Sequence, residues 1–143
     1  MYLYWGDIHN HCGISYGYGS LANALAAARG QLDFCAVTGH ALWPDMPPRQ
    51  PGFEFVVDFH ERGFAKLATH WNQVLAQMNA ANVDGEFVTL QSYEMHSRGY
   101  GDHHILSPSP DLPLVNGESP AALLAQLGGR PAMAVPHHVA YVP

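Results

Sequence analysis

Short apolar runs alternate with amphipathic stretches along the whole chain. Apolar side chains recur at three- and four-residue steps between residues 64 and 78, which predicts a long helix with one buried face. Shorter helices are predicted to begin after Ser20 and after Ser119, because serine is a favoured N-cap residue. The apolar runs with the length of buried strands are 3–8, 34–38, 87–90, 104–106 and 132–135.

The predicted elements follow the order β-α-β-α-β-β-α-β. Strands that alternate with helices favour parallel pairing and an α/β layer or barrel. Five strands are few for a closed barrel, so residues 1–143 are interpreted as one domain that is incomplete. A parallel sheet of five strands has two open edges, and we expect a second copy or a partner chain to cover them.

Charge and composition exclude two classes of partner. The chain has 143 residues, 48% of them hydrophobic, and a formal net charge of −6 with only six Lys and Arg residues. A nucleic-acid ligand held by phosphate neutralisation is therefore not expected. No apolar run approaches 18 residues and the first residues do not resemble a secretory signal, so we predict a cytoplasmic protein without a membrane partner.

Histidines and one glutamate gather where the predicted strands end. The carboxyl ends of parallel strands meet at one edge, so these side chains are expected to converge. Imidazole combined with carboxylate suits Zn, Mn or Fe better than Ca or Mg. A single carboxylate among several histidines suits a bridge between two ions. The predicted metal ligands are His9, His11, His40, Glu94, His104 and His137.

Two histidine pairs and one arginine are further candidates. Adjacent residues of an extended chain face opposite ways, so one member of His103–His104 and one of His137–His138 is expected to reach the metal. His103 and His138 are then candidates for substrate binding. Arg98 lies in a glycine-bearing loop, where it could bind an anionic substrate or simply be solvated.

Several segments, taken together, resemble the PHP (polymerase and histidinol phosphatase) superfamily. The segments are 6–11, 32–40, 85–94, 101–106 and 135–138. The resemblance implies the N-terminal part of a distorted (β/α)7 TIM-like barrel without its last strands. It also implies two or three divalent ions and phosphoester hydrolysis as the commonest chemistry.

The resemblance also implies a role for each ligand. By position, His9 and His11 bind the first ion, His104 and His137 the second and His40 the third, with Glu94 bridging the first two. Glu94 and His137 would be the catalytic pair. The chain departs from the family at Gly39, where an aspartate is usual, and it has no late Asp-x-His motif before Pro143.

The sequence therefore predicts a metal-dependent hydrolase, with a small phosphoester as substrate and a metal-bound hydroxide as nucleophile. No side-chain nucleophile is needed. Two alternatives remain open at this point. The same ions could hydrolyse an amide or a lactone, or the chain could bind metal without turnover as a subunit completed by another chain.

Overall fold

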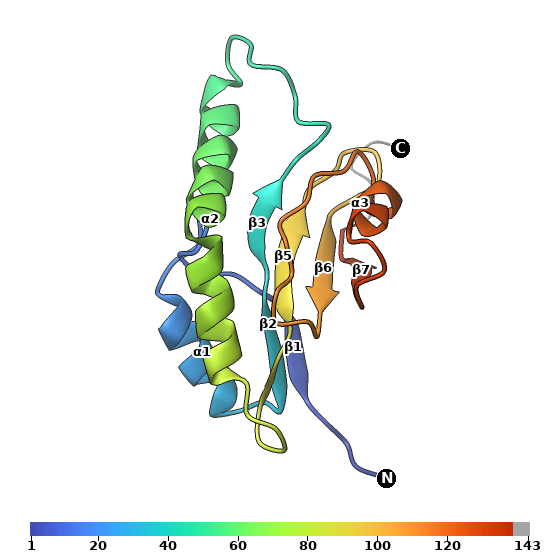
Figure 1. Ribbon diagram of the computed structural model, residues 1–143. Coiled ribbons are helices and arrows are strands. Elements are labelled where there is room, and N and C mark those ends of the chain that lie inside the picture. The colour runs from blue at the N-terminus through green and yellow to red at the C-terminus, as the bar shows by residue number, and fades with distance from the viewer. Residues whose placement is uncertain (139–143) are drawn as a thin grey trace.

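The computed structural model describes residues 1–138, which form three helices and two small sheets (Figure 1). The helices are α1 (Leu21–Arg29), α2 (Glu54–Ala81) and α3 (Pro120–Gln126). The strands are β1 (Gly6–Asn10), β2 (Phe34–Val37), β3 (Gly39–Leu42), β4 (Val88–Thr89), β5 (Gln91–Met95), β6 (His103–Ser107) and β7 (Met133–Pro136).

The two sheets differ in strand direction. The first has the order β1-β2-β4 and is parallel throughout. The second has the order β3-β5-β6-β7, in which β3 and β5 are parallel while β6 is antiparallel to both of its neighbours. The second sheet therefore brings the carboxyl ends of β3, β5 and β7 to the end where β6 begins.

Two of the predicted strands are only the first halves of longer segments. The run 34–38 is β2, and the chain continues into β3 after Thr38, whose backbone N–H donates to Asn10 O at 2.7 Å. The run 87–90 contains β4, and β5 follows Leu90. Each segment thus passes from the first sheet into the second. All five residues of β5 are buried although several are polar, so no alternation marked this strand in the sequence.

The predicted partial (β/α)7 TIM-like barrel of the PHP type is wrong. Residues 1–138 form two sheets of three and four strands, with no closed barrel among them. The expectation of uniformly parallel pairing fails at β6. Only residues 96–102 connect β5 to β6, whereas a parallel crossover needs a dozen residues or more, so the two strands pair antiparallel.

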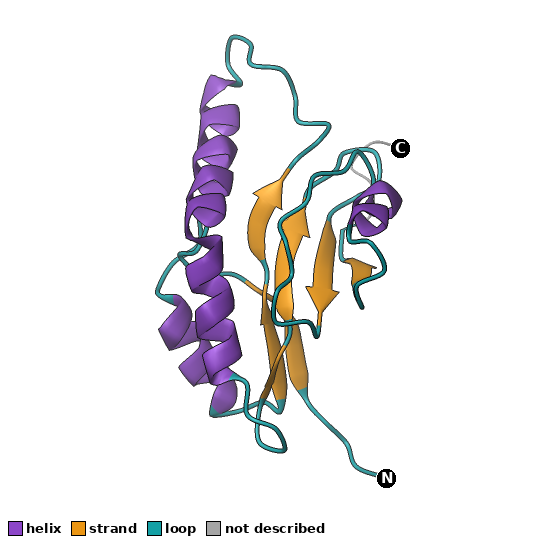
Figure 2. Cartoon of the chain, viewed as in Figure 1, coloured by secondary structure: helices purple, strands orange, loops and turns teal. Residues whose placement is uncertain are grey.

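The helices follow their predicted signals. Ser20 Oγ accepts a hydrogen bond from Asn23 N at 3.2 Å and caps α1. The buried face of α2 includes Leu67 and Trp71, and the indole N–H of Trp71 donates to Leu112 O at 2.7 Å. Figure 2 shows α1 and α2 together on one side of the strands and α3 on the other side, near β7. Helices therefore pack against the strands from two sides.

The helices and the sheet edges concern the two predictions about a membrane and a partner chain. No helix within residues 1–138 is long and apolar enough to cross a membrane. Within the same residues, β1 pairs only with β2 and β7 pairs only with β6, so each has one edge without a neighbouring strand. Coverage of those edges by a second copy or another chain stays a prediction.

Candidate metal centre

The second sheet places a carboxylate between imidazoles from its neighbouring strands. Glu94 lies near the end of β5, in register with His40 on β3 and with His104 on β6. His11 follows β1 and His137 follows β7. Because β6 runs antiparallel, His104 stands at its beginning, which is the same end of the sheet at which β3 and β5 finish. The predicted ligands are therefore brought together by a mixed sheet.

Glu94 is the centre of this cluster. Its side chain is only 2% exposed, and both carboxylate oxygens face imidazole nitrogens. The N–O distances from Glu94 are 3.4 Å to His11, 3.6 Å to His40, 3.6 Å to His96, 3.5 Å to His104 and 3.4 Å to His137. Burying a carboxylate is energetically costly unless it is paired or coordinates a metal. Glu94 is therefore expected either to pair with these imidazoles or to share a metal with them.

The spacing of these atoms differs from that of a hydrogen-bonded network. Charge-assisted N–H···O bonds are about 2.7–2.9 Å long, so every Glu94 contact is too long by about 0.5 Å or more. Four ligand atoms placed tetrahedrally about 2.1 Å from one ion lie about 3.4 Å from each other. Among residues 1–138, Glu94 Oε2, His104 Nε2 and His137 Nε2 are also buried without a hydrogen-bond partner. The donor set therefore fits a divalent ion between the atoms.

The side chains divide into three groups that could each hold an ion. Within each group, one ligand atom from every residue lies within 4.8 Å of the others. The groups are His9, His11, Glu94 and His104; His40, Glu94 and His96; and Asp102, His137 and His138. Glu94 belongs to two of them, which is the arrangement expected of a bridging carboxylate. Buried His and Glu side chains of this protein thus form sites that could hold metal.

Burial keeps several of the histidines neutral. Burial lowers the pKa of His40 to about 3 and the pKa of His137 to about 4, and it also lowers those of His9 and His11. For Glu94, burial alone would raise the pKa, but the contact with His104 and the other nearby imidazoles outweigh it, and the net shift is downward. At neutral pH these four histidines are therefore neutral and Glu94 is ionised, which are the protonation states that ligate metals.

A comparison of the chain with protein-family models and with curated proteins finds no match in either. The resemblance to the PHP superfamily accordingly stays a prediction that rests on the quoted motifs.

A second buried carboxylate, which is not among the predicted ligands, extends the cluster. Asp102 is 1% exposed, and its Oδ2 lies 3.2 Å from His96 Nδ1 and 3.0 Å from His138 Nδ1. Its Oδ1 accepts a hydrogen bond from Ser97 N at 3.1 Å. Glu94-x-His96 and Asp102-x-His104 have the same alternate spacing as His9-x-His11, and that spacing was the available signal.

Tyr16 is another neighbour that the sequence did not single out. Its hydroxyl lies 2.8 Å from His96 Nε2, and its ring stacks on His40 with centroids 3.9 Å apart. With Nε2 engaged by Tyr16, the other nitrogen of His96 is directed at Glu94 and Asp102. Tyr16 therefore fixes the orientation of two imidazoles in the cluster, as groups beside metal ligands commonly do.

The histidine pairs behave differently from each other. His104 lies in the cluster, whereas Nδ1 of His103 hydrogen-bonds the carbonyl of Gly101 at 2.8 Å, as strand alternation predicts. His137 and His138, by contrast, both lie close to Asp102. Because β7 ends at Pro136, the alternation of a regular strand does not extend to these two residues, and the expectation that only one of them binds metal stays a prediction.

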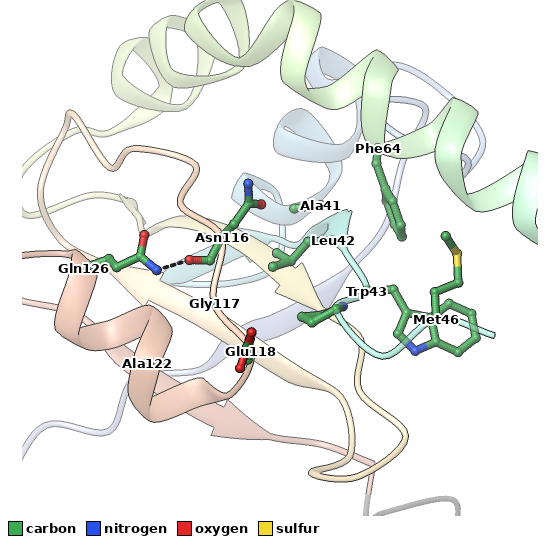
Figure 3. A pocket seen from close by; sticks show the side chains of 11 residues that line it. Ala41, Leu42, Trp43, Met46, Phe64, Asn116, Gly117, Glu118, Ala122 and Gln126 are labelled. Atoms are coloured by element: carbon green, nitrogen blue, oxygen red, sulfur yellow. Dashed lines mark hydrogen bonds between the residues drawn. The ribbon is translucent and has the colours of Figure 1, made fainter. Parts of the chain in front are cut away.

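A cavity of about 650 Å³ lies away from the candidate metal ligands. It extends from Trp43 and Phe64 to Glu118 and Gln126, and it includes no residue of the three groups (Figure 3). The predicted substrate residue Arg98 lines a different cavity, of about 510 Å³, together with His96 and Asp102. Of the two cavities, the smaller one is therefore next to the candidate metal centre.

Proposed function

We propose that this protein is a divalent-metal-dependent hydrolase that acts on phosphoesters. The observation that carries the proposal is the buried Glu94, which is surrounded by five imidazoles at distances typical of co-ligands and not of hydrogen bonds. The His and Glu composition of the cluster favours Zn, Mn or Fe. The motifs that resemble the PHP superfamily favour phosphoesters over other substrates.

The protein's own residues would hold and orient the site. Glu94 and His137 are the candidates for direct participation, Glu94 as a bridge and His137 as a ligand from the opposite side. Divalent ions bound there would supply Lewis-acid activation of water and offset negative charge on phosphoryl oxygens. Ser15 Oγ accepts a hydrogen bond from His40 N at 3.1 Å and lies 3.3 Å from His40 Nδ1, so it leaves Nε2 of that ring directed at Glu94.

The direct test is metal-dependent phosphate release. The metal-free protein is assayed with small phosphomonoesters before and after addition of Zn²⁺ or Mn²⁺. We expect turnover that requires the ion and that falls by about 100-fold or more in Glu94→Gln, because a neutral amide of the same shape cannot replace a bridging carboxylate. Glu86→Gln is the matched control, since Glu86 is an exposed partner of Arg29 outside the cluster.

Other outcomes would replace the proposal. Metal-dependent cleavage of an amide or lactone, with no phosphate release from any ester, would assign the same centre to a different bond. Absence of turnover on all three substrate classes in a protein that binds its ions would show that the chain is a metal-binding subunit and not a hydrolase.

A further inference from the structure

The cavity next to the candidate metal centre is lined by both polar and apolar residues. His96 and Asp102 form the end shared with the cluster. Its volume of about 510 Å³ lies within the range of small-molecule sites. The walls come from the loop between β3 and α2, from the start of α2 and from the loop between β5 and β6. The other lining residues are Trp43, Pro47, Pro48, Gln50, Phe53, His60 and Arg98.

Arg98 is the cation of this cavity, and its guanidinium has no hydrogen bond or ion pair with any residue in the range 1–138. The other four arginines each use the guanidinium in such a contact within the same range: Arg29 with Glu86, Arg49 with Asp58 and Glu61, Arg62 with Asp58 O, and Arg130 with Asp111. Arg98 is therefore available to an anion at the edge of the cavity.

The backbone that carries Arg98 is fixed. Asp45 accepts hydrogen bonds from the backbone N–H of Arg98 at 3.0 Å and of Gly99 at 2.8 Å, and from Ser97 Oγ at 3.2 Å. These bonds also join the two loops that form the cavity walls. An anchored loop that presents an unpaired guanidinium is organised before a ligand arrives.

Aromatic side chains also line the cavity. The Trp43 ring lies 5.5 Å from the His96 ring and 4.9 Å from the His60 ring, measured between centroids. Phe53 is 45% exposed at the N-cap of α2, where its side chain makes no capping hydrogen bond. Flat apolar side chains beside a cation match a ligand that is both planar and negatively charged.

We propose that this cavity binds the organic group of the substrate, and that the substrate is an aromatic phosphomonoester. Its ring packs between Trp43 and Phe53, and Arg98 pairs with phosphoryl oxygens that face the His96 and Asp102 end of the cavity. The inference rests on the proposed function for the identity of the anion. The ring-binding and anion-binding residues can nevertheless be tested by binding alone.

The experiment compares ligands and matched variants. Phenylphosphonate and methylphosphonate, which lack the scissile ester bond, are titrated into the metal-loaded protein by calorimetry. We expect phenylphosphonate to bind more tightly. Phe53→Ala should weaken phenylphosphonate about 3- to 10-fold without affecting methylphosphonate, because only the ring contact is lost. Arg98→Gln should weaken both ligands by about 10- to 100-fold, as loss of a charge-assisted contact does.

The controls lie on α2 and outside the cavity. Phe55→Ala removes an aromatic ring that is 72% exposed, and Arg62→Gln removes a guanidinium whose one hydrogen bond within residues 1–138 is to the backbone carbonyl of Asp58. Each should leave both affinities unchanged.

A second assay separates this inference from the proposed function. Benzyl phosphate and ethyl phosphate have alcohols of similar acidity as leaving groups, so a preference for the benzyl ester reports binding and not chemistry. Selective phenylphosphonate binding without hydrolysis of either ester would support the cavity and contradict the phosphoesterase. Hydrolysis with equal binding of the two phosphonates, no measurable phosphonate binding, or either variant matching its control would overturn the cavity assignment.

Discussion

At the scale of single residues, burial determines the chemistry of the candidate centre. His40 and His137 are held in surroundings that oppose protonation, and their pKa values fall to about 3 and about 4. Glu94 is ionised among them although it is buried, because the neighbouring imidazoles compensate for its lost hydration. Burial therefore leaves the imidazoles of His40 and His137 neutral beside the ionised carboxylate of Glu94.

This burial predicts how the stability of the metal-free protein depends on pH. Below pH 6.5 the unfolded chain protonates its histidines, while folded His40 and His137 stay neutral until about pH 3 and 4. The unfolded state then binds more protons, so the free energy of unfolding should decrease as the pH falls from 6.5 toward 4, and should be insensitive to these groups above 6.5. Urea unfolding in the presence of a chelator at several pH values measures this.

A pair of variants assigns the effect to the cluster. His40→Asn removes one titrating group and should make the decline below pH 6.5 shallower. His70→Asn, on the exposed surface of α2, should leave the decline as it is in the wild type. An unchanged slope in His40→Asn would show that His40 is not held neutral by burial.

At the scale of elements, the long helix supports the site through a glycine. Gly63 is buried on α2, and a Cβ at this position would overlap the ring of Tyr16. Tyr16 in turn stacks on His40 and reaches His96. The absence of a side chain at Gly63 therefore allows the loop after β1 to pack against α2 and to place the phenol in the cluster.

A double-mutant cycle tests that packing. Gly63→Ala alone should lower the free energy of unfolding by about 1–3 kcal/mol, because the overlap outweighs the better helix propensity of alanine. In a Tyr16→Ala background the same change should be neutral, or stabilising by up to about 1 kcal/mol. Equal effects in both backgrounds, measured by denaturant unfolding, would show that the helix and Tyr16 are not coupled.

The elements also show how far the sequence could be interpreted. The three helices were predictable because Ser20 and Ser119 mark two starts and the apolar spacing marks the face of α2. The continuation of the chain into β3 and β5 was not predictable, because β5 is polar in sequence yet buried. The direction of β6 was open to inference, since residues 96–102 are too few for a parallel crossover.

The candidate site was more predictable than the fold around it. The alternate spacing in His9-x-His11 marked ligands without knowledge of the topology, and the same spacing in Glu94-x-His96 was available but was not used. Asp102-x-His104 has the same spacing, so Asp102 was equally predictable. Tyr16 was not predictable, because its position depends on the contact between the loop after β1 and α2, which is a tertiary feature.

At the scale of the whole molecule, the two sheets place the Glu94 carboxylate among candidate metal ligands from five separate segments. No pair of neighbouring segments could build the cluster alone, since its members come from β1, β3, β5, β6 and the residues after β7. An ion bound to all of them would join both sheets. Metal binding and the stability of the fold are therefore expected to be coupled.

The most direct test of the central claim is a calorimetric titration of Zn²⁺ or Mn²⁺ into the metal-free protein, repeated for two neighbouring histidine variants. We predict at least one ion per wild-type chain. His104→Asn should weaken binding by more than about 100-fold, because His104 is a buried member of the cluster. His103→Asn should bind as the wild type does, because His103 faces Gly101 instead. No measurable binding by the wild type, or equal affinities for the two variants, would contradict the assignment of this cluster as a metal centre.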